Sequence, residues 1–456
     1  MCGLVAVFGR DFVKKDTVDR VNAAIDSMSY RGLPGRRGIH CTKDAVLGHV
    51  RLPIVGLDVN NDQPLIHNDA ALAFVGEVHN YKDLSPGAVC DSEVVLNAWL
   101  SGIDNWRRFD GFWSATLVDE KNGVGCVAVD YLAQKPLYLR RDKCAVASEL
   151  RPLFAFGVLT LDETYLSNVL KWGYDPTGRT PYLEVEKIPP GCAITFPLIE
   201  GLGSTRAERY FSLTPKINTT RVDLASLVDR SVKARLVSDV PVATLLSGGL
   251  DSTIVSILAK KADADIVAFH VENDEWTYAR DVATQNRFNI KRLELSHDLH
   301  AEAMSFMQEP VDLGSVLPQF LLGRAVSFEN YHVALSGDGA DELFGGYSRA
   351  SQYDSQWSDV FCELVHYHIP KLDRCMMASA VELRCPFLAP YVVEAALGLD
   401  WSKRKNKEIL RKAFSDIVPE SVINRKKMPL RTHDPKDASV RKFLVDDFRK
   451  GFNRHA

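Results

Sequence analysis

VATLLSGGLDS, residues 242–252, decides the fold of the second half of the chain. An apolar run followed by two glycines and a further apolar run predicts a buried strand, a tight loop and a helix. Ligands of such units bind beyond the carboxyl ends of the strands. The glycines let backbone N–H groups approach phosphate oxygens, and the hydroxyls of Ser247 and Ser252 can donate as well. Asp251 is expected to hold Mg²⁺, because a bare carboxylate would repel phosphate. Standing alone, the same residues equally suit a tight turn that caps a helix.

A second loop rich in glycine and acids follows another predicted strand, residues 332–335. It reads SGDGADELFGGY over residues 336–347. Within it, Asp341 is a candidate second Mg²⁺ ligand and Asp338 a candidate polar partner for a bound intermediate. The basic triplet 425–427 is placed to stabilise a leaving pyrophosphate, although a solvated helix end explains such a triplet by itself. Two such loops at strand ends favour a polyphosphate site.

The pattern of the chain changes near residue 211. The residues before it read mostly as short strands with few helices, which predicts stacked sheets with flanking helices. Beyond it, helices and strands alternate as in a parallel α/β sheet, and helices dominate from residue 376. For 456 residues we expect two domains, here 1–210 and 211–456. The elements predicted for the second domain are the strands 242–246, 266–271 and 332–335 and the helices 224–236, 252–261 and 278–287.

Bulk composition excludes several classes of function. The chain is 46% hydrophobic and 25% charged with a formal net charge of −4, so nothing favours a nucleic-acid partner. No apolar run approaches the ~20 residues that cross a bilayer, and charged residues soon follow the short apolar stretch 4–8. We therefore expect neither a membrane span nor a signal peptide. Nine scattered cysteines without a C-x-x-C pair indicate a reduced, cytoplasmic protein without structural zinc.

Cys2 is distinguished by its position. Removal of Met1 would free its α-amine, and the residue would then hold a nucleophile and a base together. A cysteine thiol titrates at about 8.5 and an α-amine at about 7.7–8.0, so the amine can relay the thiol proton at neutral pH without a histidine. Together with the two loops, this predicts ammonia released at one site and an activated carboxylate made at the other.

Further motifs run in order along the chain. They are Tyr30-Arg31-Gly32, Gly48-His49-Val50-Arg51-Leu52, Gln63-Pro64-Leu65, Gly76-Glu77, Asp91-Ser92-Glu93, Phe109-Asp110-Gly111, Gln134-Lys135-Pro136-Leu137-Tyr138, Ser238-Asp239-Val240-Pro241, Val381-Glu382-Leu383-Arg384-Cys385-Pro386-Phe387-Leu388 and Leu410-Arg411-Lys412-Ala413-Phe414. With Cys2 and the two loops, this series resembles the glutamine-dependent asparagine synthetase family over nearly the full length. The resemblance implies a class II glutamine amidotransferase domain with an N-terminal-nucleophile (Ntn) hydrolase αββα sandwich. It also implies a parallel-sheet α/β PP-loop synthetase domain with a helical C-terminal part.

For the first domain the resemblance implies that Cys2 attacks the side-chain amide of glutamine. Arg51 would bind the glutamine α-carboxylate as a bidentate pair, and Glu77 and Asp91 would hold its α-amine. The backbone N–H of Gly76 would be one oxyanion donor. The ammonia would then travel inside the protein to the second domain.

For the second domain the resemblance implies that ATP and Mg²⁺ convert aspartate to an acyl-adenylate and release pyrophosphate. Asp251 and Asp341 would hold Mg²⁺, Asp338 would help the ammonia step, and Lys427 would stabilise the adenylation transition state. A homodimer is a further implication. ATP would be bound by residues at the two strand ends, namely Leu245, Ser247, Gly248, Gly249, Asp251, Ser252, Ser336 and Gly337.

Departures from the family pattern leave the acceptor less secure than the reaction type. Val75 stands where the family has an asparagine oxyanion donor, and loss of such a donor costs about 10²–10³ in rate. A weak glutaminase is therefore predicted, with free ammonia as the practical nitrogen donor in the extreme case. The family's Arg-Gly-Pro-Asp is Arg31-Gly32-Leu33-Pro34 here, and the chain is shorter than typical members. Two alternatives stay open: the same chemistry on a peptide, sugar acid, nucleobase or antibiotic precursor, and a non-catalytic regulatory protein on an inherited scaffold.

Overall fold

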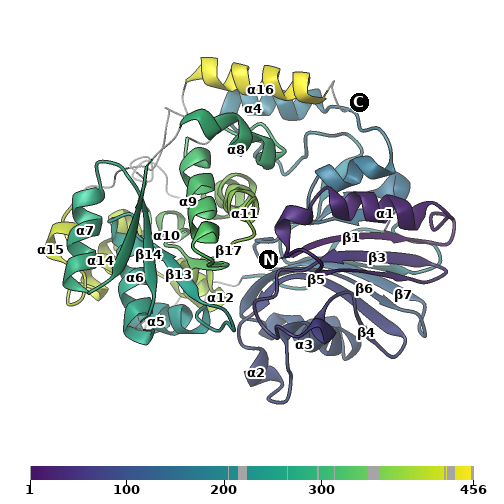
Figure 1. The fold of residues 1–456 in the computed structure, drawn as a ribbon, viewed down its shortest axis with the longest axis horizontal. Coiled ribbons are helices and arrows are strands. Elements are labelled where there is room, and N and C mark those ends of the chain that lie inside the picture. The colour runs from purple at the N-terminus through teal and green to yellow at the C-terminus, as the bar shows by residue number, and fades with distance from the viewer. Residues whose placement is uncertain are drawn as a thin grey trace.

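Three sheets organise the protein in the computed structural model (Figure 1). Two are antiparallel and belong to the first part of the chain, and the third is parallel and belongs to the second part. No helix among the described residues has both the length and the apolar character needed to cross a bilayer. The structure describes residues 2–203, 205–213, 223–263, 265–294, 297–312, 314–347, 359–425, 428 and 437–452.

The first part is a stack of two six-stranded antiparallel sheets. One has the order β10-β8-β9-β1-β3-β2 and consists of β1 (Gly3–Phe8), β2 (Arg37–Cys41), β3 (Ala45–Val50), β8 (Tyr138–Arg140), β9 (Ala145–Ala147) and β10 (Val185–Lys187). The other has the order β12-β11-β7-β6-β5-β4 and consists of β4 (Leu65–His67), β5 (Ala70–Val78), β6 (Gly111–Asp119), β7 (Val124–Val129), β11 (Cys192–Pro197) and β12 (Glu208–Arg209). Helix α1 (Thr17–Asp26) covers the first sheet and α3 (Asp91–Leu100) the second (Figure 1). The predicted αββα sandwich is confirmed.

Burial of both faces explains the sequences of the central strands. Every residue of β1 and of β6 is buried, which is why these strands read as apolar runs rather than as alternating patterns. The rings of Phe8 and Phe196 meet edge to face across the stack at 5.0 Å. Gly3 pairs with Val50 in the first sheet. This register sets Cys2 beside the segment that follows β3, where Arg51 lies.

The second part contains a five-stranded parallel sheet with the order β15-β14-β13-β16-β17. Its strands are β13 (Val242–Leu245), β14 (Val267–Val271), β15 (Asn289–Leu293), β16 (Val333–Leu335) and β17 (Glu382–Arg384). Strand β13 pairs with β14 on one side and with β16 on the other. The strand order therefore reverses at β13, and ligands of open α/β sheets bind at such a switch point. The loops after β13 and β16 leave this same edge of the sheet.

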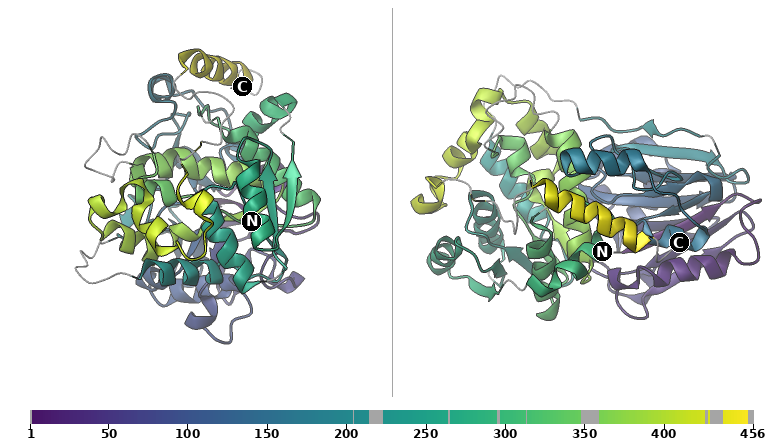
Figure 2. Two further views of the ribbon diagram at one scale, coloured as in Figure 1. Left: turned by 90° about the vertical axis from the view of Figure 1, so that its left-hand side faces the viewer. Right: turned by 90° about the horizontal axis from the view of Figure 1, so that it is seen from above.

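Helices surround the parallel sheet and extend back to the first part. Helix α16 (Ala438–Phe452) packs against α4 (Glu163–Trp172) of the first part, and Figure 2 shows the C-terminal helix crossing to that side. The helices of the second part are α5 (Leu224–Ala234), α6 (Leu250–Ala262), α7 (Trp276–Gln285), α8 (His300–Met307), α9 (Val316–Phe328), α10 (Ala340–Phe344), α11 (Ile369–Met377), α12 (Pro390–Leu397), α13 (Trp401–Arg404), α14 (Glu408–Ala413), α15 (Glu420–Ile423) and α16 (Ala438–Phe452).

Two strands of the parallel sheet escaped sequence analysis. β15 reads NIKRL and carries charged residues in an edge strand, so it lacks the apolar run that marked β13 and β14. β17 is three residues long, ELR, and lies inside the stretch in which helices were predicted to dominate. Its Glu382 and Arg384 are both fully buried and bond to each other with Nε–Oε1 at 2.6 Å. The internal ion pair lets this charged strand lie in the interior.

Candidate functional site

Cys2 lies immediately before β1, between the two parts of the molecule (Figure 1). Its side chain is buried, and Sγ lies 4.0 Å from the carbonyl oxygen of Leu52. Burial raises the pKa of the Cys2 thiol, and the contact with Leu52 and the charge of Arg51 offset this effect only in part. A thiol in this state needs a base to become the attacking thiolate.

The backbone of Cys2 is held by a buried arginine, Arg31, to which sequence analysis assigned no role. Arg31 Nε donates to the Cys2 carbonyl oxygen at 2.9 Å. Its terminal nitrogens pair with Glu149 at 2.5 Å and with Asp373 at 3.0 Å. Asp373 lies on α11 of the second part and also accepts from Lys135 at 2.7 Å. All four side chains are at most 5% exposed, so a buried ion network joins the backbone at Cys2 to the second part.

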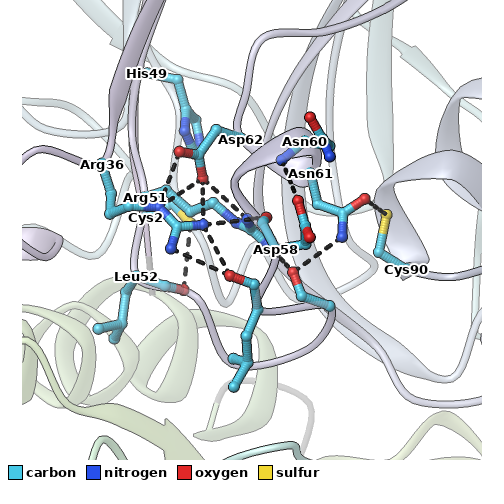
Figure 3. A network of polar contacts seen from close by, with 12 residues as sticks. Cys2, Arg36, His49, Arg51, Leu52, Asp58, Asn60, Asn61, Asp62 and Cys90 are labelled. Atoms are coloured by element: carbon cyan, nitrogen blue, oxygen red, sulfur yellow. Dashed lines mark hydrogen bonds and ion pairs between the residues drawn. The ribbon is translucent and has the colours of Figure 1, made fainter.

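Arg51 lies close to Cys2, as the resemblance implied, but its guanidinium group already has internal partners (Figure 3). Nη1 donates to the carbonyl oxygen of Asp58 at 3.1 Å and to Asp62 Oδ1 at 2.9 Å. Nη2 donates to the carbonyl oxygens of Val55 and Gly56 at 3.0 and 2.7 Å. Four of the five N–H donors of this side chain are thus used within the protein.

Glu77 and Asp91, the predicted ligands of an α-amine, lie close enough together to interact electrostatically. Both are buried. Burial raises the pKa of Glu77 well above its usual range, and the negative charges of Asp91 and Glu382 add to this effect. Burial also raises the pKa of Asp91 to about 6, although Asp91 accepts from the Val78 N–H at 2.9 Å. Two buried carboxyl groups of this kind gain most from a cation placed between them.

Gly76 lies in β5 next to Val75, at the predicted oxyanion turn. Its φ is +129°, and a Cβ would stand 2.0 Å from the carbonyl oxygen of Phe112, so only glycine fits. Val75 is fully buried in the apolar core and brings no hydrogen-bond donor. The structure thus gives no substitute at position 75 for the missing side-chain donor.

The two predicted phosphate loops touch each other at the switch point. Ser247 Oγ bonds to Ser252 Oγ at 2.9 Å, and Gly249 N donates to Ser247 Oγ at 3.2 Å. A Cβ on Gly337 would stand 2.6 Å from the backbone nitrogen of Ser252, so the second loop needs glycine to approach α6. Gly248 has a φ of +83°. Leu245 ends β13 and Ser336 follows β16, so every residue predicted to bind ATP gathers at one sheet edge.

A lysine, Lys407, lies between the two predicted metal ligands. Its Nζ contacts a carboxylate oxygen of Asp251 and lies 2.5 Å from Asp341 Oδ1. The Lys407 side chain is 6% exposed. Burial opposes its charge, but the two carboxylates outweigh burial and raise the pKa of the ammonium above its usual range. Sequence analysis missed Lys407, and its place just ahead of the quoted 410–414 motif was the available signal.

The predicted donor set for Mg²⁺ is the pair of carboxylates of Asp251 and Asp341. Among the residues that the structure describes, no cluster of three or more His, Cys, Asp or Glu side chains could hold a metal. Mg²⁺ commonly binds through one or two carboxylates together with substrate phosphates, so Asp251 and Asp341 beside the phosphate loops fit the ion. Their shared contact with Lys407 shows that they converge on one point.

The remaining predicted residues lie around this edge or outside the described part. Asp338 accepts a hydrogen bond from the Ser336 hydroxyl. Burial and the nearby negative charge of Asp338 raise the pKa of the Cys385 thiol. Arg425 Nη1 donates to the carbonyl oxygen of Gly248 at 3.0 Å, which brings one cation of the basic triplet to the first loop. Lys427 lies outside the described residues, as does its neighbour in the triplet.

Comparison with known proteins matches both parts of the chain. Residues 1–210 match a family described as glutamine amidotransferase domain, and residues 223–362 and 356–454 match one described as asparagine synthase. The chain is 26% identical to asparagine synthetase B of Escherichia coli over 94% of its length and 81% of that protein. It is 24% identical to asparagine synthetase 3 of Bacillus subtilis over 95% of its length and 88% of the relative. An NH₃-dependent NAD synthetase structure from Campylobacter jejuni covers 51% of this chain and 95% of its own at 15% identity, with a TM-score of 0.27.

Proposed function

The chain belongs to the asparagine synthase family, with an N-terminal glutamine amidotransferase domain, and from this premise we propose a glutamine-dependent amide synthetase. It would activate a carboxylate with ATP, aspartate being the first candidate, and amidate it with ammonia taken from glutamine. The observation that carries the proposal is the joint presence of a buried Cys2 near Arg51 and Glu77, and of paired phosphate loops at a sheet switch point. The working units proposed are residues 1–210 and 211–456.

At the first site, removal of Met1 would expose the α-amine of Cys2. The thiol would pass its proton to that amine and attack the side-chain carbonyl carbon of glutamine, forming a carbon–sulfur bond. The Gly76 N–H would stabilise the oxyanion, and ammonia would leave with the relayed proton. Water would then hydrolyse the thioester to glutamate and restore the thiol. Glu77 and Asp91 would hold the α-ammonium, since the buried Glu77 lies near the thiol and the buried Asp91 lies near Glu77.

At the second site, the loop backbones would cradle the ATP phosphates. The acceptor carboxylate would attack the α-phosphorus, forming an acyl-adenylate and expelling pyrophosphate, and ammonia would then displace AMP to give the amide. Mg²⁺ held by Asp251 and Asp341 would supply charge neutralisation of the phosphates when bound. Lys407 would add a second positive charge there, and Lys427 and Asp338 keep the roles that the resemblance implies: transition-state charge for the former and assistance to the ammonia step for the latter.

A different acceptor carboxylate is the second candidate. Relatives at 24–26% identity support the family and its chemistry, while the acceptor is determined by the side chains of the site rather than by the fold. This candidate keeps both half-reactions and differs in the molecule that is amidated.

The test is pyrophosphate release from ATP and Mg²⁺ with aspartate, run with glutamine, with ammonium and without a nitrogen source, with asparagine quantified. Asparagine from glutamine and from ammonium is the expected result. Cys2→Ala should abolish synthesis from glutamine and spare synthesis from ammonium. Loss of both together would contradict the two-site proposal, and absence of pyrophosphate with aspartate would transfer the proposal to another acceptor.

A further inference from the structure

Asp62 contacts Arg51 in the first domain, and neither the sequence motifs nor the comparisons assign a role to Asp62 (Figure 3). Its carboxylate bonds to Arg51 Nη1 at 2.9 Å. It is also held by Arg36, whose Nε lies 2.9 and 2.8 Å from the two oxygens and whose Nη2 lies 2.6 Å from Oδ1. Two guanidinium groups therefore share one carboxylate.

The cluster is open to solvent on one side and fixed on the other. The side chain of Asp62 is 22% exposed and that of Arg36 is 18% exposed, whereas that of Arg51 is 6% exposed. Burial would raise the pKa of Asp62, but the hydrogen bonds and charges of Arg36 and Arg51 outweigh it and lower the pKa. Asp62 is thus an anion at the exposed end of the Arg51 fork, and backbone carbonyls hold the remaining Arg51 donors.

We propose that Asp62 occupies, in the free protein, the position on Arg51 that the α-carboxylate of the amide donor takes, and so sets the affinity for that donor. This inference rests on the proposed function, in which Arg51 recognises the α-carboxylate of glutamine. Binding is then an exchange of one carboxylate for another. Asp62 remains paired with Arg36 when it leaves Arg51, so the exchange does not strand a buried charge.

The charge of the cluster explains why the exchange is feasible. Two guanidinium groups and one carboxylate leave the cluster with one unit of net positive charge. The incoming α-carboxylate supplies the negative charge that balances it. The carbonyl oxygens of Val55, Gly56 and Asp58 keep the Arg51 plane in place throughout. Asp62 therefore acts on donor affinity and on selection for a free α-carboxylate, while the thiol itself keeps its surroundings.

The test uses labelling of Cys2 in the full-length protein by two electrophiles. One is a diazoketone analogue of glutamine with a free α-amine and α-carboxylate, and the other is iodoacetamide, which has neither. Asp62→Ala should raise the labelling efficiency of the diazoketone roughly tenfold, since a charge-assisted hydrogen bond no longer competes. Asp62→Asn should shift it in the same direction, and iodoacetamide labelling should stay within about twofold.

The matched control is Asp26→Ala, which removes a carboxylate from an ion pair with Arg37, the neighbour of Arg36. It should leave both labelling rates at the wild-type value. Slower or unchanged diazoketone labelling in Asp62→Ala would overturn the proposal and make Asp62 a support that holds Arg51 in place. Labelling of every variant by iodoacetamide but of none by the diazoketone would instead remove glutamine as the donor, a result that is separate from any ratio between variants.

Discussion

The substitution Asp373→Asn tests whether the buried ion network holds the backbone at Cys2 in place. Asp373 lies on α11, and its carboxylate pairs with Arg31 at 3.0 Å and Lys135 at 2.7 Å. Arg31 in turn pairs with Glu149 at 2.5 Å and donates to the Cys2 carbonyl oxygen. Two cations and two anions balance in this network, so the substitution leaves one buried positive charge in excess. Breaking a buried pair from one side costs about 3–5 kcal/mol, and the retained amide oxygen puts the expected loss at about 3 kcal/mol.

Urea unfolding measures the loss of stability, and labelling of Cys2 measures its consequence at the nucleophile. We expect the rate of glutamine hydrolysis to fall, because Arg31 loses its ion pair with position 373 and so holds the Cys2 carbonyl oxygen less firmly. Asp312→Asn is the matched control: Asp312 is buried and pairs with Arg441 at 2.8 Å, away from this network. It should lower stability and leave Cys2 labelling unchanged. Wild-type stability together with wild-type labelling in Asp373→Asn would refute the reasoning.

The pH dependence of this loss gives an independent check. Burial would raise the pKa of Asp373, but Arg31 and Lys135 outweigh it and hold the pKa well below its usual range. A carboxyl group with a depressed folded pKa contributes stability above its unfolded pKa of about 3.9, and loses it as the pH falls through the folded pKa. The difference in unfolding free energy between wild type and Asp373→Asn should therefore be the same at pH 5 and pH 8. A difference that vanished already at pH 5 would contradict this assignment.

Three further predictions concern the two sites. Val75→Asn should raise glutamine hydrolysis by up to about 10²-fold by adding an oxyanion donor, and an efficient wild type that gains nothing would contradict this. The pKa of Asp91 is raised to about 6, so Asp91 loses its charge as the pH falls below 6. Glutamine binding to the Cys2→Ala protein, measured by calorimetry, should therefore weaken by up to about tenfold per pH unit below 6. Equal affinity at pH 5 and pH 8 would exclude Asp91 as an ammonium ligand. Lys407→Ala should lower ammonia-driven pyrophosphate release by about 10²-fold and spare glutamine hydrolysis, so a parallel fall of both activities would indicate a folding defect.

Local patterns predicted much of the fold. The stretch 242–252 forms strand, loop and helix as expected, because an apolar run, paired glycines and a helix-forming run each act over a few residues. The charged strand β15 was missed because its neighbours, rather than its own sequence, make it a strand.

The candidate sites depend on contacts that no local pattern encodes. Arg31 and Asp373 are 342 positions apart, and Lys407 and Asp251 are 156 positions apart. Their meeting follows from the packing of distant elements, since α11 lies against β17 and the segment Lys405–Lys407 lies against α10. The resemblance supplied roles for Arg51 and Asp251, but it gave no account of the side chains that neutralise them in the free protein.

In the proposed function, each site holds an internal counterion where its ligand would bind. At the first site a carboxylate, Asp62, already sits on the arginine that would receive a carboxylate. At the second site an ammonium, Lys407, already sits on the carboxylates that would receive a cation. Internal counterions of this kind lower the free-energy cost of burying charge in the free protein. An unpaired buried charge would cost several kcal/mol, which is on the order of a large part of a protein's free energy of unfolding. At the first site, the counterion Asp62 would also reduce the affinity for the donor to the difference between two similar interactions. Removing the counterion should then tighten binding at the first site, where Arg51 keeps its backbone anchors, and disrupt the second site, where Lys407 is the shared partner of both carboxylates.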